Sequence, residues 1–374
     1  MDISIIIVNW NSAAFLRECL RSIYSTVTRL QFEVIVIDNA SFDGSDFMVR
    51  REFPEVRFIQ SRKNLGFAGA NNIAFAHSSG KNVLFLNPDT ELTGNALEVM
   101  CSALDTTVDA GVVGCKLLNT DLSVQTACIQ AFPSILNQTL NCEFLRALFP
   151  KSFLWGSRPL FVPSNQPSAV DCVSGACLMI RRIVFEQVGQ FNTSYFMYAE
   201  DRDLCYKVAR AGWRSYFVSD ATVIHHGGRS SSHRPNHFAA VLMQESTLTF
   251  VRAQHGRVYG LCYRCSTIFV SIARIILLVT ALTFAIRKSL RQSMRRSLGK
   301  WFNILRWSIG LENWARTCTH AVSSSAADPA GPVRSELRAQ EGQKRTDVCD
   351  ICGEGGLDGA RRVEPAFRSP SNRG

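Results

Sequence analysis

The sequence lacks both of the glycine-rich loops by which many enzymes hold nucleotide phosphates. The turn after the first apolar run reads NWNSAA and contains no glycine, so the GxGxxG turn of dinucleotide-binding dehydrogenases is absent. No GxxxxGK(S/T) motif occurs, which excludes a Walker-type phosphate loop. Only one stretch approaches the length needed to cross a bilayer, and this excludes a polytopic transporter.

The composition also lacks the biases of non-globular chains. Of the 374 residues, 46% are hydrophobic and 19% are charged, which excludes a collagen, a disulfide miniprotein and a wholly disordered chain. The first residues, MDISIIIVNWN, have no basic n-region and no small-residue cleavage site, so we expect no signal peptide. The 13 cysteines are scattered and odd in number. We therefore expect reduced thiols and a cytoplasmic location.

Residues beyond about 318 differ in composition from the rest of the chain. They are rich in Ala, Ser, Gly, Pro and mixed charges, which predicts a disordered tail over 318–374. Cys349 and Cys352 in this tail form a single CxxC pair. Because a zinc site usually needs a second such pair, we expect no metal there.

The positive charge of the chain is concentrated in one segment. The formal net charge is +10, and residues 287–309 contain seven Lys or Arg and no Asp or Glu. The preceding stretch, 266–286, is apolar except for Arg274, which would be costly at the centre of a bilayer. Basic residues with Trp301 and Trp307 among them suit an anionic membrane surface. We therefore expect an in-plane or re-entrant helix rather than a span. A buried helix followed by a solvated one, or a nucleic-acid-binding patch, are the alternatives.

Apolar runs and helical patterns alternate along the first hundred residues. Runs typical of strands covered on both faces occur at 3–8, 33–37, 56–60 and 82–87. The segments between them predict helices over 13–25, 43–53 and 66–79. Further along, strand-like patterns cover 171–182 and 215–231. The alternation predicts a parallel sheet with right-handed crossovers, whose ligands bind beyond the carboxyl ends of the strands.

The segments that directly follow the first four strands are polar. Their candidate binding residues are Asn9, Asn11, Asp38, Asn64, Gly66, Asn87 and Asp89. Such residues often only form turns. Four polar turns at one edge of a sheet favour a nucleotide-binding cleft, since amide and carboxylate groups can hydrogen-bond a base or a ribose. Asp89 could also hold Mg²⁺ or Mn²⁺, which would neutralise a departing diphosphate.

A second group of candidates opens a predicted helix. Glu200, Asp201 and Asp203 follow an aromatic segment, and helix capping accounts for only one or two of these acids. A carboxylate there could act as a general base toward a hydroxyl, and Arg202 would help to keep it ionised. His225 ends a strand-like run beside two glycines, where an imidazole is either a surface group or a ligand of a metal or phosphate.

Seven motifs, taken in order, resemble those of the inverting family-2 glycosyltransferases of the GT-A fold, particularly the rhamnosyltransferase-like branch. The motifs are IIIVNWNS, VIDNASFDGS, NLGFAGANN, FLNPDTEL, VSGACLMIRR, YFMYAEDRDLCYKVARAGW and VIHHGG. The resemblance implies an α/β fold with a Rossmann-like, mixed and mainly parallel sheet flanked by helices. We expect this domain to cover 1–250, and a hydrophobic and basic, helical, membrane-associating segment to cover 251–317.

The resemblance assigns the residues of the nucleotide-sugar site by position. Asp38 matches the aspartate that binds the nucleobase imide, and Asn9 and Asn11 match the turn that lines the base and the ribose. Asn64 and Gly66 belong to the NLGFAGANN motif and are expected to border the same site.

The resemblance also assigns the metal and the base. The family commonly has a D-x-D metal motif, and here Asn87 replaces its first carboxylate while Asp89 keeps the last. Asp201, in the acidic pair with Glu200, matches the catalytic base. His225 matches a histidine that completes metal or diphosphate binding. A divalent cation, Mg²⁺ or Mn²⁺, is therefore expected, with Asp89 and His225 as its ligands.

The implied reaction is a single displacement that inverts the anomeric carbon. The resemblance suggests dTDP-L-rhamnose as the donor, with other UDP- or dTDP-sugars as alternatives. The acceptor is expected to be a lipid-linked saccharide or polysaccharide of the cell envelope, reached at the cytoplasmic face of the membrane, and no nucleic acid is expected as a partner. A sugar-nucleotide-binding protein without transfer activity is the remaining alternative.

Overall fold

The computed structural model describes the chain except for residues 163, 165, 228–237, 285–286 and 317–374. The chain divides into the units Met1–Asp328 and Pro329–Gly374. The tail predicted over 318–374, with Cys349 and Cys352, therefore lies outside the described residues.

The first half of the central sheet is parallel, as the alternation of strands and helices predicts. Its strands lie in the order β3–β2–β1–β4, and their bounds are β1 (Ile3–Asn9), β2 (Phe32–Asp38), β3 (Arg57–Gln60) and β4 (Asn82–Leu86). The helices that connect them are α1 (Ala13–Thr26), α2 (Ser45–Glu52) and α3 (Gly66–Phe75). Asn9 pairs in register with Asp38, so the polar ends of β1 and β2 lie side by side.

The second half makes the sheet mixed, as the resemblance implies. β10 (Cys177–Arg181) lies antiparallel between β4 and β6 (Ala110–Leu118), and β11 (Arg214–His225) runs parallel to β6. The short strands β5 (Thr90–Leu92) and β8 (Ser168–Val170) pair antiparallel with β11. The full order is β3–β2–β1–β4–β10–β6–β11–β5, with β8 beside β11.

The segment predicted as one strand over 171–182 contains two strands. β9 (Cys172–Val173) pairs antiparallel with β7 (Ile129–Gln130), and β10 begins four residues later. Val173 packs directly on Gly114, where an added Cβ would come within 2.5 Å of the Val173 Cβ. The prediction of one strand was wrong because the turn at residues 174–176 is bracketed by apolar residues on both sides. This turn brings backbone to the carboxyl end of β4.

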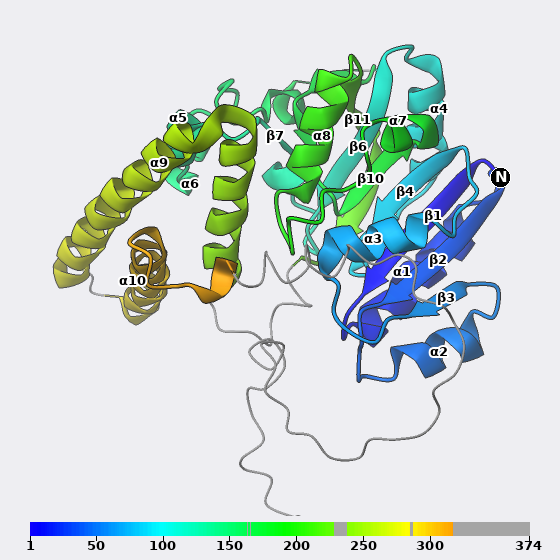
Figure 1. The fold of residues 1–374 in the computed structure, drawn as a ribbon, viewed down its shortest axis with the longest axis horizontal. Coiled ribbons are helices and arrows are strands. Elements are labelled where there is room, and N and C mark those ends of the chain that lie inside the picture. Colours follow the sequence, from blue (N-terminus) through cyan, green and yellow to red (C-terminus); the bar gives the residue numbers. More distant parts are fainter. Residues whose placement is uncertain (163, 165, 228–237, 285–286, 317–374) are drawn as a thin grey trace, which may run out of the picture. The chain divides into compact units, whose positions relative to one another are not determined.

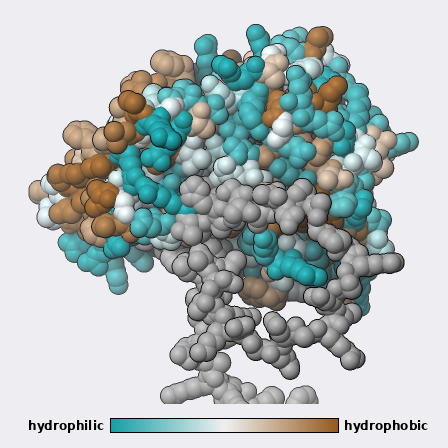
Figure 2. Space-filling model, in the orientation of Figure 1, coloured by the Kyte–Doolittle hydropathy of each residue, from teal (hydrophilic) through white to brown (hydrophobic). Residues whose placement is uncertain are grey.

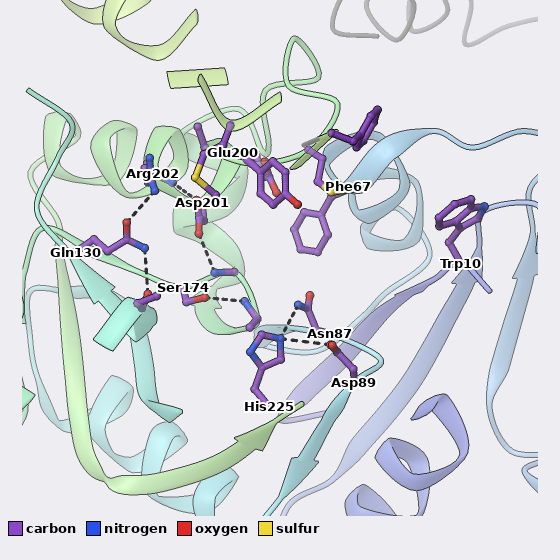
Figure 3. A pocket seen from close by; sticks show the side chains of 18 residues that line it. Trp10, Phe67, Asn87, Asp89, Gln130, Ser174, Glu200, Asp201, Arg202 and His225 are labelled. Carbon is purple, nitrogen blue, oxygen red and sulfur yellow. Dashed lines mark hydrogen bonds and ion pairs between the residues drawn. The ribbon is translucent and has the colours of Figure 1, made fainter. Parts of the chain in front are cut away.

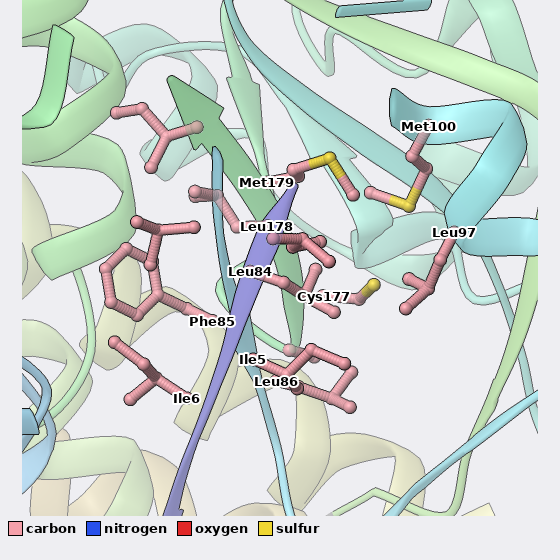
Figure 4. Packing of buried hydrophobic residues seen from close by; sticks show 14 of the residues in the cluster. Ile5, Ile6, Leu84, Phe85, Leu86, Leu97, Met100, Cys177, Leu178 and Met179 are labelled. Carbon is pink, nitrogen blue, oxygen red and sulfur yellow. The ribbon is translucent and has the colours of Figure 1, made fainter. Parts of the chain in front are cut away.

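The core lies on both sides of the strands. Figure 4 shows Leu97 and Met100 of α4 (Ala96–Thr106) on one side of β4 and Phe85 on the other. The ring of Phe85 lies 4.7 Å from that of Phe191, centroid to centroid. The helices α7 (Arg182–Gln187) and α8 (Glu200–Arg210) follow β10, and the 3₁₀ turns are η1 (Thr126–Cys128) and η2 (Arg158–Phe161). These layers hold the strand ends rigidly in place.

Two long helices follow the sheet (Figure 1). They are α9 (Phe238–Phe284), interrupted at Gly256 with φ 88°, and α10 (Lys288–Ser308), which match the predicted apolar and basic segments. They pack on one another, and α9 also packs on α5 (Ile135–Thr139), which precedes α6 (Glu143–Leu148). Trp307 of α10 is buried and donates its indole N–H to Oε2 of the buried Glu245 of α9, at 2.6 Å.

Candidate active site

A cavity of about 380 Å³ lies beyond the carboxyl end of β4 (Figure 3). It brings together five residues predicted from the sequence: Asn87, Asp89, Glu200, Asp201 and His225. The turn between β4 and β5 supplies the first two, the first turn of α8 supplies the acidic pair, and β11 ends at the histidine. Two carboxylates from distant parts of the chain therefore open into one cavity.

Asp89 and His225 are neighbours because β5 pairs with β11. The register places His225 opposite Thr90, one residue after Asp89. The Nε2 atom of His225 lies 3.4 Å from Oδ1 of Asp89 and 3.4 Å from Nδ2 of Asn87. The Asp89 side chain is almost fully buried, so its negative charge is directed into the cavity rather than into solvent.

Gln125 holds the imidazole of His225 in place. The Gln125 Nε2 group donates to the backbone oxygen of His225 at 2.6 Å and to Oδ1 of Asn119 at 2.8 Å. With both donors engaged in this way, its Oε1 faces Nδ1 of His225 at 2.9 Å. An amide oxygen can only accept, so Nδ1 carries a proton, and Nε2 is the ring nitrogen that faces Asp89 and Asn87.

Asp89 and His225 fit a divalent cation. A carboxylate oxygen and an unprotonated imidazole nitrogen are both ligand types that such ions accept. Among the described residues, no group of three or more His, Cys, Asp or Glu side chains could enclose a metal ion. A cation held by these two residues would therefore keep most of its coordination positions open for diphosphate oxygens.

Asp201 is fixed by the turn between β9 and β10. Its Oδ2 accepts the backbone N–H of Gly175 at 3.1 Å, and its Oδ1 accepts the backbone N–H of Arg202 at 2.8 Å. Its side chain is half-buried and borders the cavity. Both oxygens keep further lone pairs, so the carboxylate can accept a proton from a hydroxyl placed in the cavity.

Glu200 lies beside Asp201 in a different environment. The Glu200 side chain is buried, and its Oε2 has no hydrogen-bond partner among the described residues. Burial, and next the negative charge of Asp201, raise the pKa of Glu200 to about 8. Near neutral pH Glu200 therefore keeps its proton.

The start of α8 adopts an unusual backbone. Tyr198 and Ala199, directly before Glu200, have φ values of 71° and 65°, in the left-handed region. Non-glycine residues adopt this conformation at a cost of order 1 kcal/mol or more.

Asp203, three residues after Glu200 in α8, is buried and accepts hydrogen bonds from the Tyr195 hydroxyl and the Gln254 amide, each at 3.3 Å. Through these bonds it joins α8 to the preceding segment and to α9.

The five residues predicted at the first three turns do not line this cavity. Asp38 is 1% exposed and accepts the backbone N–H of Ser41 at 2.8 Å and the side-chain amide of Asn9 at 3.3 Å. Asn11 Oδ1 accepts from the backbone N–H of Phe42. These side chains organise the ends of β1 and β2 in the described conformation.

The remaining two predicted residues form a turn against the aromatic lead-in to α8. Asn64 Oδ1 accepts the backbone N–H of Gly66, and Gly66 has a φ of 70°. An added Cβ at Gly66 would come within 2.3 Å of the Phe196 carbonyl oxygen. Only glycine fits there, which explains its place in the motif.

Sequence reasoning missed several residues of the cavity wall. Trp10, between Asn9 and Asn11, borders the cavity, and Phe67, after Gly66, does so as well. Both residues lie inside motifs quoted above, so their sequence positions could have indicated that they border the site. Gln125, in contrast, lies in a stretch with no motif, and only the fold brings it to His225.

Comparison with known proteins identifies relatives that match up to two thirds of this chain. A family model described as Glycosyl transferase family 2 matches residues 4–189. N-acetylglucosaminyl-diphospho-decaprenol L-rhamnosyltransferase of Mycobacterium tuberculosis (strain ATCC 25618 / H37Rv) is 30% identical over 267 residues, covering 67% of this chain and 84% of that protein. Rhamnosyltransferase WbbL of Escherichia coli (strain K12) is 28% identical over 171 residues, covering 43% of this chain and 61% of that protein.

A solved structure shares the fold. The mannosyltransferase PcManGT from Pyrobaculum calidifontis, in complex with GDP-Man and Mn²⁺, superimposes with a TM-score of 0.54 at 18% identity. The match covers 83% of this chain and 86% of that one. At this identity the likeness concerns the arrangement of helices and strands, which is the one expected from the seven motifs.

Proposed function

The chain belongs to glycosyl transferase family 2, and from this membership we propose that it transfers L-rhamnose from dTDP-L-rhamnose to a lipid-diphosphate-linked saccharide. As a member it is an inverting glycosyltransferase. The donor and acceptor are proposed from the two rhamnosyltransferase relatives, of which one is named for a diphospho-decaprenol acceptor. The observation that carries the proposal is the opening of Asp201 and of the Asp89–His225 pair into a single cavity.

The catalytic step follows from the geometry around Asp201. The acceptor hydroxyl loses its proton to Asp201 while its oxygen bonds to the anomeric carbon. The bond from that carbon to the diphosphate breaks, and the nucleoside diphosphate leaves from the opposite face. Glu200, protonated near neutral pH, adds no second negative charge to repel the incoming diphosphate. No covalent sugar–enzyme intermediate is needed.

Asp89 and His225 are the residues that would hold a divalent cation. Such a cation, Mg²⁺ or Mn²⁺, would supply positive charge to the leaving diphosphate when bound. The Nδ2 atom of Asn87 lies 3.4 Å from Nε2 of His225, at the edge of the same site. Gln125 sets the tautomer in which Nε2 can coordinate.

The acceptor proposal is supported by the surface of α9. The apolar α9 surface consists of the exposed residues Phe269, Ile272, Ile276, Leu277, Val279 and Phe284. Figure 2 shows hydrophobic side chains gathered at the end of the molecule where α9 lies. Together with the basic α10 this surface suits an anionic bilayer, since apolar side chains can enter the headgroup region while Lys and Arg contact phosphates.

Arg274 favours an in-plane rather than a spanning arrangement. α9 is the one helix of the described part of the chain that is long and apolar enough to cross a membrane. Yet Arg274 donates to the backbone oxygen of Asn141 at 2.8 Å and stacks 4.3 Å from the Trp301 ring centroid. A helix tied in this way to the catalytic domain and to α10 can lie along the bilayer surface.

A transfer assay tests the proposal. The full-length protein is incubated with a synthetic N-acetylglucosaminyl-diphospho-alkyl acceptor and, in separate reactions, dTDP-L-rhamnose, UDP-N-acetylglucosamine and GDP-mannose, with and without Mn²⁺. We expect a rhamnosylated product, detected by mass spectrometry, from dTDP-L-rhamnose with Mn²⁺. Product from another donor alone would overturn the donor, and no product from any donor would overturn the acceptor.

A further inference from the structure

Arg202 turns away from its acidic neighbours. Its Nη2 donates to Oε1 of Gln130 at 2.8 Å, and the Gln130 amide is oriented by its own donation to the Ala127 backbone oxygen at 3.0 Å. Figure 3 shows Arg202 and Gln130 on one side of Asp201, with Asp89 and Trp10 on the other. The guanidinium therefore lies on the side of the cavity remote from the Asp89–His225 pair.

Arg146 of α6 and Arg202 of α8 approach the same short segment, because Arg202 binds the side chain of Gln130 and Trp155, which Arg146 covers, accepts the backbone N–H of Ala131 at 2.9 Å. Its guanidinium carbon lies 5.5 Å from the ring centroid of the buried Trp155, and its Nε is buried without a hydrogen-bond partner among the described residues. Burial, and next the positive charge of Arg202, lower the pKa of Arg146. The fold thus holds two half-buried cations close enough to disfavour one another.

Neither cation forms an ion pair within the described part of the chain. No ion pair joins Arg146 or Arg202 to a described carboxylate, although the exposed Arg21 has two such partners. Bringing two guanidinium groups together without a counter-ion costs free energy, and a bound anion would recover it. A phosphate matches the fork of N–H donors that arginine presents.

The pair lies between the cavity and the apolar α9 surface. Arg202 directly follows Asp201 in α8, and Asp203 of the same helix accepts a hydrogen bond from Gln254 of α9 at 3.3 Å. Asn141, just before α6, accepts the hydrogen bond from Arg274 of α9. A lipid-diphosphate-linked sugar carries its groups in the matching order: a sugar hydroxyl for the cavity, a diphosphate for the arginines and an alkyl chain for the apolar α9 surface.

We propose that Arg146 and Arg202 form a subsite for the diphosphate of the acceptor. This inference rests on the proposed function, because it takes the acceptor to be a lipid-linked saccharide. The donor diphosphate belongs at Asp89 and His225, across Asp201 from this subsite. The two arginines then select acceptors that carry a phosphate over neutral glycosides, and they set the sugar hydroxyl beside Asp201.

Binding measured without any donor tests the subsite. Isothermal titration of the full-length protein uses undecyl diphosphate, which has no sugar, and N-acetylglucosaminyl-diphospho-undecane as probes. We expect Arg146→Gln and Arg202→Gln each to weaken the binding of undecyl diphosphate about tenfold, since each removes charge-assisted hydrogen bonds. The matched control is Arg158→Gln, which removes an exposed arginine from the same region and should leave the affinity within about twofold.

Two further measurements make the outcome decisive. Thermal unfolding and dTDP binding show whether each variant is folded and whether the arginines touch the donor instead. Equal affinity of wild type and both variants for undecyl diphosphate overturns the subsite, as does a matching tenfold loss of dTDP affinity. Failure of rhamnosyl transfer with the arginine dependence intact would instead overturn the proposed function and leave the phosphate subsite standing.

Discussion

Gln125 accepts a hydrogen bond from Nδ1 of His225 while its own amide group donates to the His225 backbone oxygen. One side chain thereby fixes both the rotation of the imidazole and the nitrogen that carries its proton. Residues that orient a metal-binding histidine in this way typically change metal affinity by 10- to 100-fold when they are replaced.

We expect Gln125→Leu to weaken Mn²⁺ binding by about tenfold or more, because the imidazole is then free to rotate or to protonate Nε2. Electron paramagnetic resonance of free Mn²⁺ measures this without any turnover. The exposed Gln166→Leu serves as control. An unchanged Mn²⁺ affinity in Gln125→Leu would show that His225 does not bind the cation.

Replacing Asp201 with Asn should lower the rate of sugar transfer by about 10²- to 10⁴-fold, since the amide cannot take up the hydroxyl proton. Nucleotide binding should persist, because Asp89 and His225 are untouched. Transfer rates and dTDP affinity are measured on the same preparation, with the exposed Asp220→Asn as control. Transfer at the wild-type rate would contradict the role of Asp201 as base.

Glu200 should make the stability of the protein fall as the pH rises. The unfolded carboxyl loses its proton near pH 4.5, whereas the folded one keeps it to about pH 8. Within this window the folded state binds more protons, so a higher pH favours unfolding, by at most about 1.4 kcal/mol per pH unit for one group.

The variant Glu200→Gln cannot titrate, so its free energy of unfolding should decline less between about pH 5 and about pH 8. Urea unfolding at several pH values measures both proteins, with the exposed Glu186→Gln as control. Parallel stability curves for wild type and Glu200→Gln would contradict the raised pKa of Glu200.

Trp10 should contribute to nucleotide binding as a stacking surface at the cavity wall. Stacking of a base on an aromatic side chain contributes about 1–3 kcal/mol. We therefore expect Trp10→Ala to raise the KM for the nucleotide sugar about tenfold, and Trp10→Phe to recover most of the loss. If Trp10→Phe and Trp10→Ala behave alike, the ring acts by filling space elsewhere in the fold.

Serine substitutions at Phe269, Leu277 and Phe284 of the apolar α9 surface should reduce co-sedimentation with anionic phospholipid vesicles. Each buried aromatic or leucine side chain contributes about 1.5–3 kcal/mol, so the triple variant should lose most of the binding. Val258→Ser, at a residue of α9 that is 77% exposed just after the interruption at Gly256, is the control. Tight nucleic-acid binding without vesicle binding would favour the alternative partner of the basic segment.

The fold could be predicted where each strand carries its own signal. β1, β2 and β4 are continuous apolar runs because both faces of the sheet are covered, and their ends match the prediction within one residue. The antiparallel direction of β10 has no such local signature. It depends on the turn at Gly175, whose backbone N–H is bound by Asp201, and on the packing of the preceding Val173 against Gly114.

The candidate site could be predicted residue by residue only where a motif marks it. Asp89, Asp201 and His225 meet as the resemblance implies they should, although their roles stay predictions. The raised pKa of Glu200 could not be predicted from two adjacent acids, because it is caused mainly by burial, and burial is a property of the fold. The same holds for Arg146, whose segment has no clear period.

The hydrogen bond between Trp307 and Glu245 joins the last described helix to the one that braces the acidic pair. A chain cut short before residue 307 would leave the Glu245 carboxylate in an apolar interior without its indole donor. A protein truncated before α10 would thus be a poor substitute for the whole protein, because α10 also stabilises α9, which contacts the catalytic domain.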